Sequence, residues 1–124
     1  MTVLTTSAPA PHDVVAEVLA TADRVADELR ETAAARDKAN AAPREEIELL
    51  RRNDLLQVQE PVAYGGSGFN YAQAVQVTRR IARGDTSIAH LIGYHYAQTR
   101  IASLYGTAAQ ADALSRKNAA AKLF

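Results

Sequence analysis

The sequence of 124 residues contains no cysteine, and only 6% of its residues are aromatic. The absence of cysteine excludes disulfide bonds, zinc sites with thiolate ligands and a cysteine nucleophile. Long alternations of β-branched residues are also missing, which disfavours a large antiparallel sandwich. No apolar run approaches the roughly 20 residues that span a membrane, and the N-terminus lacks the charged start and apolar stretch of a secretory signal. We therefore expect an intracellular, cytoplasmic protein without a membrane partner.

Alanine is the residue that this sequence has in excess. It occupies 26 of the 124 positions, while Leu, Ile, Val and Phe together occupy 27. Alanine favours helix and buries little area. The composition therefore predicts an all-α fold of close-packed helices around a thin core, and the length fits a single domain.

The net charge is zero, but the charge is distributed unevenly along the chain. Residues 1–69 carry seven Lys/Arg and twelve Asp/Glu, and residues 70–124 carry seven Lys/Arg and two Asp/Glu. One interpretation is a helical domain with differently solvated faces. The other is a basic half that faces an anion, such as a phosphate-bearing cofactor or an acidic neighbour. Nucleic acid is disfavoured as a partner, because no stacking aromatic residues alternate with the basic ones.

Apolar spacing predicts five helices, and the first two lie in the first half of the chain. Residues 1–12 are expected to form a flexible leader, since they lack periodicity. The first helix is predicted from Asp13, as its N-cap, to about residue 37. A second helix is predicted over residues 43–52, with Ile47 and Leu50 facing inward. Residues 55–62 are predicted to be extended, because proline disfavours helical geometry in the residue before it.

The remaining three helices follow a loop at residues 64–68. The third is predicted from its cap, Asn70, to residue 83, and Gly84 then suits a left-handed stop. Asp85 is predicted to cap a fourth helix over residues 86–105, and Thr107 to open a fifth that runs toward residue 124. The residues aligned on the inner side of the third helix are Ala74, Val75, Thr78 and Ile81.

The glycine-rich loop fits no known phosphate-binding pattern in full. Gly66 and Gly68 match the first two positions of G-x-G-x-x-G, but Tyr71 stands at the third. A Walker loop would also need Gly-Lys-Ser/Thr, which is absent. We therefore interpret this loop as a tight turn.

The fourth predicted helix holds the residues that are most suited to chemistry. His95 continues an apolar stripe and is therefore interpreted as a packed histidine. His90 and Tyr94 are four residues apart, so they share a neighbouring face. They are either a solvated pair or two proton-bearing groups that serve a pocket. A glycine in a helix interior, such as Gly93, destabilises the helix by roughly 1 kcal/mol relative to alanine. The close approach of another molecule or segment to this turn would explain why glycine is present. His90 and His95 are five residues apart, not the four that places two imidazoles on one helical face, so a zinc site is disfavoured. No serine lies in a sequence context that is typical of a catalytic triad.

Two segments resemble the acyl-CoA dehydrogenase superfamily. The run VQEPVAYGGSG at residues 58–68 resembles its PxxYGG-G loop, and residues 75–95 resemble the two helices that follow. The run from His90 to His95 is most similar to the flavin-dependent monooxygenases of this superfamily. The resemblance implies an N-terminal helical domain over residues 13–124, of the kind that a middle β-barrel and a C-terminal helical bundle follow. Neither of those is present in this sequence.

The resemblance also implies a reaction for the full-length protein. Reduced flavin, FMN or FAD, comes from a separate flavin reductase and reacts with oxygen to form a C4a-hydroperoxyflavin. An oxygen atom then passes to a small-molecule substrate, possibly one that contains sulfur. His90 and Tyr94 are implied as catalytic residues that line this pocket. A homo-oligomer is expected, whereas the isolated chain is expected to bind no flavin and to be inactive.

Two alternatives remain open at this stage. The first is the N-terminal domain of an acyl-CoA dehydrogenase, whose catalytic glutamate would lie in the C-terminal bundle. The second is a stand-alone helical interaction module with an exposed apolar face.

Overall fold

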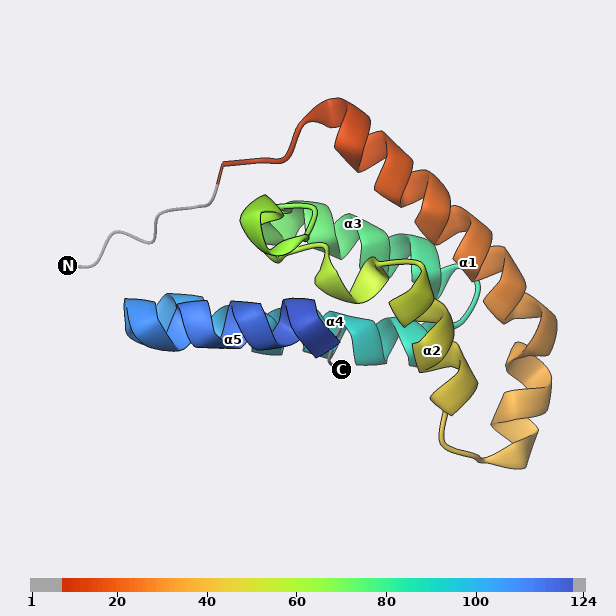
Figure 1. The fold of residues 1–124 in the computed structure, drawn as a ribbon. Helices are drawn as coiled ribbons and strands as arrows, with labels where there is room; N and C mark the ends of the chain where they lie inside the picture. The colour runs from red at the N-terminus through yellow and green to blue at the C-terminus, as the bar shows by residue number, and fades with distance from the viewer. Residues whose placement is uncertain (1–7, 122–124) are drawn as a thin grey trace.

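The computed structural model describes residues 8–121, and this part of the chain folds into helices without any strand. Five α-helices and two short 3₁₀ helices follow one another (Figure 1): α1 (His12–Ala39), α2 (Arg44–Arg52), η1 (Leu55–Gln57), η2 (Val62–Tyr64), α3 (Tyr71–Ala82), α4 (Thr86–Tyr105) and α5 (Ala108–Ala121). The prediction of five helices is therefore confirmed. Most of the predicted leader and the last residues of the fifth predicted helix lie outside the described residues.

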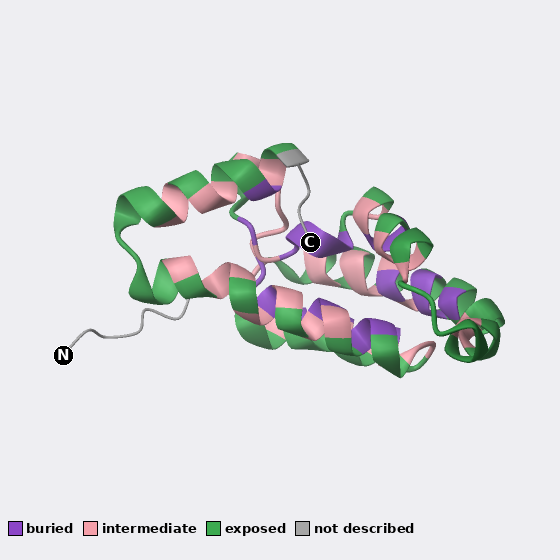
Figure 2. Ribbon diagram, turned by 90° about the horizontal axis from the view of Figure 1, so that it is seen from below, coloured by how far each residue is buried: buried purple, intermediate pink, exposed green. Residues whose placement is uncertain are grey.

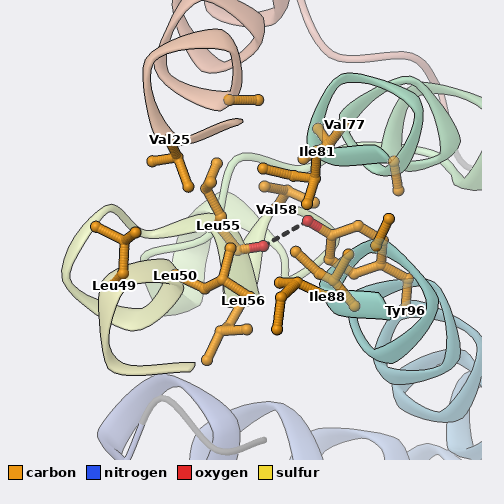
Figure 3. Close-up of a cluster of buried hydrophobic side chains, with 14 of the residues drawn as sticks. Val25, Leu49, Leu50, Leu55, Leu56, Val58, Val77, Ile81, Ile88 and Tyr96 are labelled. Carbon is orange, nitrogen blue, oxygen red and sulfur yellow. Dashed lines mark hydrogen bonds between the residues drawn. The ribbon is translucent and has the colours of Figure 1, made fainter. Parts of the chain in front are cut away.

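The helices pack in a simple order around one core. α3 lies between α1 and α4, and α5 runs beside α4 (Figure 1). The sides of α1, α3 and α4 that face one another are buried, while their outer sides are exposed (Figure 2). Figure 3 shows that η1 enters this core between α1 and α4 and contributes Leu55 and Leu56. α5 contributes no buried apolar side chain among its described residues.

The helix ends agree with the sequence at three of the predicted caps. The side chain of Asn70 accepts from the backbone N–H of Gln73, and the Gln73 side chain accepts from the backbone N–H of Asn70. Asp85 accepts from the backbone N–H of Ile88 at 3.0 Å. Thr107 and Gln110 exchange the same reciprocal bonds before α5. These side chains satisfy N–H groups that have no partner within the helix.

The predicted cap of the first helix was wrong. The helix begins one residue earlier, at His12, with Pro11 in the capping position and no side-chain hydrogen bond. Asp13 instead lies within the first turn, where its charge complements the helix dipole.

The predicted extended segment at residues 55–62 was also wrong. Residues 55–57 form the 3₁₀ helix η1, and residues 62–64 form η2. Leu55, Leu56 and Val58 are all buried. A tight 3₁₀ turn buries consecutive apolar residues on several sides, which an extended chain with alternating sides would not do.

The structure corrects two details of the third helix. Val75 is exposed and Thr78 is only half-buried, whereas Val77 is buried beside Ala74 and Ile81. Gly84 does not have a positive φ, so it is not a left-handed stop. A β-carbon on Gly84 would lie 1.9 Å from the carbonyl oxygen of Ala26. Gly84 therefore lets the α3–α4 turn lie directly against the backbone of α1.

The charge asymmetry is partly neutralised within the chain. Asp23 of α1 pairs with Arg80 of α3 at 2.5 Å and with Arg83 at 3.0 Å. The acidic first half thus supplies an acidic neighbour to part of the basic second half. Among the described residues, no helix is long and apolar enough to cross a membrane.

Candidate functional site

A groove of about 450 Å³ lies between α3 and α4. Its volume falls within the range of small-molecule sites, and most of its lining is apolar. Tyr71 and Val75 are exposed here although they are large and apolar. The residues that define its walls are Tyr71, Val75 and Thr78 from α3 and His90, Gly93 and Tyr94 from α4.

His90 and Tyr94 lie side by side on the groove face of α4. Their ring centroids are 4.9 Å apart, and the ring planes are tilted by 42°. Both residues are exposed, and Tyr94 has 60% of its surface accessible. Within residues 8–121 neither ring makes a hydrogen bond. The i, i+4 spacing therefore presents an imidazole and a phenol with unused polar atoms to whatever occupies the groove.

His95 and Tyr96, which follow Tyr94, hold α4 in place through hydrogen bonds to η1. The Nε2 atom of His95 lies 2.7 Å from the carbonyl oxygen of Leu56, and the hydroxyl of Tyr96 donates to the carbonyl oxygen of Leu55 at 2.5 Å (Figure 3). Because a carbonyl only accepts, His95 donates through Nε2–H. Burial lowers the pKa of His95, although its bond to Leu56 and the charge of Glu60 act in the opposite direction. This agrees with the interpretation of His95 as a packed histidine.

The start of α4 is fixed by an ion pair with α1. Asp85 caps α4 and also accepts from Arg36, which pairs in addition with Glu46 of α2 at 3.4 Å. Burial raises the pKa of Asp85, but the bonds from the backbone N–H of Ile88 and from Arg36 outweigh it, so that the net pKa is lowered. The carboxylate therefore stays charged and holds the N-terminus of α4, five residues before His90.

The glycine loop closes on its own chain. The backbone N–H groups of Gly65, Gly66 and Gly68 donate to the carbonyl oxygens of Val62, Pro61 and Glu60. Gly65 and Gly68 have positive φ angles of 88° and 67°. Amides that are already used cannot cradle a phosphate, so this loop is a tight turn, as interpreted from the sequence.

A buried polar cluster joins α5 to the segment before this loop. The Nδ2 atom of Asn118 donates to the Oε1 atom of Glu60 at 2.8 Å, and Gln57 donates to the carbonyl oxygen of Asn118 at 2.6 Å. Glu60 and Asn118 are 6% and 5% exposed. α5 is thus attached largely by polar contacts rather than by an apolar face.

Sequence reasoning found the α4 side of the groove but not the α3 side. Tyr71 and Val75 were interpreted as a motif mismatch and as a core position, and only their exposure identifies them as groove walls. A signal was present, since Tyr71, Val75 and Thr78 follow helical spacing on a face next to the buried one. Within the described residues, no group of three or more acidic or histidine side chains could hold a metal ion.

Comparison with known proteins gives a consistent family. The family described as "Acyl-CoA dehydrogenase, N-terminal domain" matches residues 15–122. Dibenzothiophene monooxygenase from Rhodococcus erythropolis is 38% identical over 96 residues, which cover 77% of this chain and 23% of that protein. A putative acyl-CoA dehydrogenase from Bacillus subtilis is 36% identical over 72 residues, covering 58% of this chain and 19% of that protein. The chain spans about a quarter or less of these relatives.

A solved structure shares most of the helical arrangement. The dibenzothiophene monooxygenase of Paenibacillus sp. A11-2 superimposes with a TM-score of 0.83 and 26% identity, over 88% of this chain and 28% of that one. The same protein was also solved in complex with FMN and indole, and this structure superimposes with a TM-score of 0.82. The resemblance found in the sequence therefore extends to the fold.

Proposed function

Because the chain belongs to the acyl-CoA dehydrogenase family through its N-terminal domain, we propose that it is the helical domain of a flavin-dependent monooxygenase that uses FMN. The observation that carries the proposal is the exposed pair of His90 and Tyr94 in an apolar groove. The similarity to dibenzothiophene monooxygenases from two genera supports it. The apolar groove favours a small apolar substrate. The similarity to these monooxygenases favours a separate flavin reductase and a homo-oligomeric assembly for the full-length protein.

The residues of this chain fit one side of a flavin site. The groove presents the imidazole of His90 and the phenols of Tyr94 and Tyr71, and none of these three rings has a hydrogen-bond partner among the described residues. His90 and Tyr94 form a polar edge beside the apolar part of the lining. The amides of the three loop glycines already donate to carbonyl oxygens of this chain, so they are not offered to the phosphate of FMN. We therefore assign His90 and Tyr94 to the reacting side of the cofactor, and assign phosphate binding to other parts of the full-length protein. In this reaction one atom of O₂ enters the substrate and the other leaves as water, with two electrons from the reduced flavin.

His90 and Tyr94 perform separate tasks in this proposal. The Tyr94 hydroxyl donates a hydrogen bond toward the oxygen that is transferred or released, and His90 supplies or receives the accompanying proton. Once other parts of the full-length protein cover the groove, its apolar side chains from α3 help to exclude water, which limits the wasteful loss of activated oxygen. The anchors at Asp85, His95 and Tyr96 hold α4 rigidly, so that both rings keep their positions.

The test is the coupling of flavin oxidation to product formation in the full-length protein. His90→Ala and Tyr94→Phe should lower the product formed per flavin oxidised by about 10²-fold, the usual contribution of a proton-transfer group. Flavin oxidation itself should continue. Tyr105→Phe is the matched control, because Tyr105 is an exposed tyrosine of α4 outside the groove lining.

Two outcomes would overturn the proposal. Unchanged coupling in both variants would remove the assigned roles of His90 and Tyr94. Reduction of a dye that depends on an acyl-CoA substrate, without oxygen transfer, would assign the full-length protein to the dehydrogenases instead.

A further inference from the structure

Gly93 is a glycine that neither backbone geometry nor packing requires. It lies within α4, and its φ is not positive. In such a position glycine is less favourable than alanine. A β-carbon on Gly93 would meet only the side chain of Thr78, at 3.5 Å from its methyl carbon and 4.0 Å from its hydroxyl oxygen. Both distances are ordinary van der Waals contacts, so the core would tolerate alanine here.

Four of the other five glycines give a clear contrast. A β-carbon would lie 2.1 Å from a backbone oxygen at Gly66 and 1.9 Å from one at Gly84. Gly65 and Gly68 have positive φ angles that other residues rarely adopt. Each of these four glycines therefore has a structural reason, and Gly93 has none that the described residues reveal.

The absence of a side chain at Gly93 leaves space in the groove. Gly93 lies on the groove face of α4 between His90 and Tyr94, and Thr78 lies opposite on α3. A methyl group at position 93 would reach Thr78 and bridge the two helices. The missing side chain therefore corresponds to space in the groove between α3 and α4.

We propose that Gly93, with Thr78 opposite, sets the depth of the groove and so the size of the apolar substrate that the site accepts. This inference rests on the proposed function, because it takes the occupant of the groove to be the substrate. The lining supports an apolar occupant, since most of its surface is apolar. The polar side-chain atoms of the lining come from His90 and from the hydroxyls of its threonines and tyrosines. Gly93 is a specificity-determining residue in this scheme and takes no part in proton transfer.

The test is a titration of the purified chain with a graded series of apolar probes. Indole, 3-methylindole and 3-ethylindole differ by one carbon each, and their binding is followed through amide chemical shifts of α3 and α4. In the natural chain affinity should rise by roughly fourfold with each added carbon, because each buries further apolar area. In Gly93→Ala the affinity for indole should stay the same within about twofold, and the increase with added carbons should vanish or reverse.

A second substitution makes the test reciprocal. Thr78→Ser removes the methyl group that the new side chain would touch and keeps the hydroxyl, which lies 3.5 Å from the carbonyl oxygen of Ala74. Added to Gly93→Ala, it should restore the increase in affinity. Gln98→Ala is the matched control, because Gln98 is an exposed residue of α4 that does not line the groove. It should leave the series unchanged.

The stability of the variant separates this inference from a packing role. Gly93→Ala should unfold at a higher urea concentration than the natural chain, since alanine favours helix. A lower midpoint would show that packing needs the glycine and would overturn the inference. The inference would also be overturned if affinity rose equally with each added carbon in the natural chain and in Gly93→Ala, or if the natural chain bound none of the three indoles. No step of this titration uses flavin, so failure of the proposed function shows separately, in the coupling assay.

Discussion

The hydroxyl of Tyr96 donates a hydrogen bond of 2.5 Å to the carbonyl oxygen of Leu55 in the middle of the core (Figure 3). Tyr96 is 1% exposed, and burial raises the pKa of its hydroxyl well above the ordinary value. Two residues earlier on the same helix, Tyr94 points its ring into the open groove. One turn of helix thus carries one tyrosine that stabilises the fold and another that is available for chemistry.

We predict that Tyr96→Phe lowers the stability of the fold and that Tyr94→Phe leaves it nearly unchanged. Tyr96→Phe removes a buried hydrogen bond to the carbonyl oxygen of Leu55, so the free energy of unfolding should fall by about 0.5–1.5 kcal/mol. Tyr94→Phe removes an exposed hydroxyl and should change it by less than about 0.5 kcal/mol. Urea unfolding of both variants measures this. Equal losses in the two variants would contradict the assignment of separate roles.

The sequence predicted those features that depend on local patterns. The caps at Asn70, Asp85 and Thr107 need only residues within one turn, and His90 and Tyr94 share a face because of helical spacing alone. The role of Gly84 was predicted wrongly, because glycine is needed there for close contact with the backbone of Ala26, which is distant in sequence. The residues at 55–57 were misread because burial by α1 and α4 overrides local propensity.

We predict that His95 makes the fold less stable at mildly acidic pH. Burial lowers the pKa of His95 in the folded chain below the ordinary 6.5, so the unfolded chain binds the proton more tightly. The stabilisation is complete above the ordinary pKa and is lost as the pH falls through the lowered one. The free energy of unfolding should therefore decrease as the pH falls below the ordinary pKa of histidine, about 6.5.

His95→Gln provides the control for this pH dependence. Its amide nitrogen can still donate to the carbonyl oxygen of Leu56, but it does not titrate. Urea unfolding at several pH values should show a weaker pH dependence in this variant than in the natural chain. A slope that persists in His95→Gln would assign the effect to another group.

Asp85 allows the cap of α4 to be separated from its ion pair. Asp85→Asn keeps an oxygen for the Ile88 N–H but loses the charge toward Arg36, and Asp85→Ala loses both. We expect a loss of about 1–2 kcal/mol in the free energy of unfolding for the first variant and about 1 kcal/mol more for the second.

The lowered pKa of Asp85 adds a further expectation: part of the stability should vanish below about pH 4, and should not do so in Asp85→Asn. Asp13→Ala, which removes a carboxylate without a capping bond, should cost less than about 0.5 kcal/mol.

Gly84 should be the least replaceable glycine of the described chain. In Gly84→Ala the new methyl group would meet the carbonyl oxygen of Ala26 at 1.9 Å, so α1 and the α3–α4 turn must separate. We expect a loss of about 3 kcal/mol or more in the free energy of unfolding, because overpacking here strains backbone rather than a flexible side chain. Gly65→Ala is the comparison: its β-carbon has open space, and its φ of 88° alone should cost about 1–2 kcal/mol. Because α4 follows this turn directly, Gly84→Ala should also shift the amide signals of His90 and Tyr94, while Gly65→Ala should leave them in place. Equal stability of Gly84→Ala and the natural chain would show that α1 does not lie against the turn.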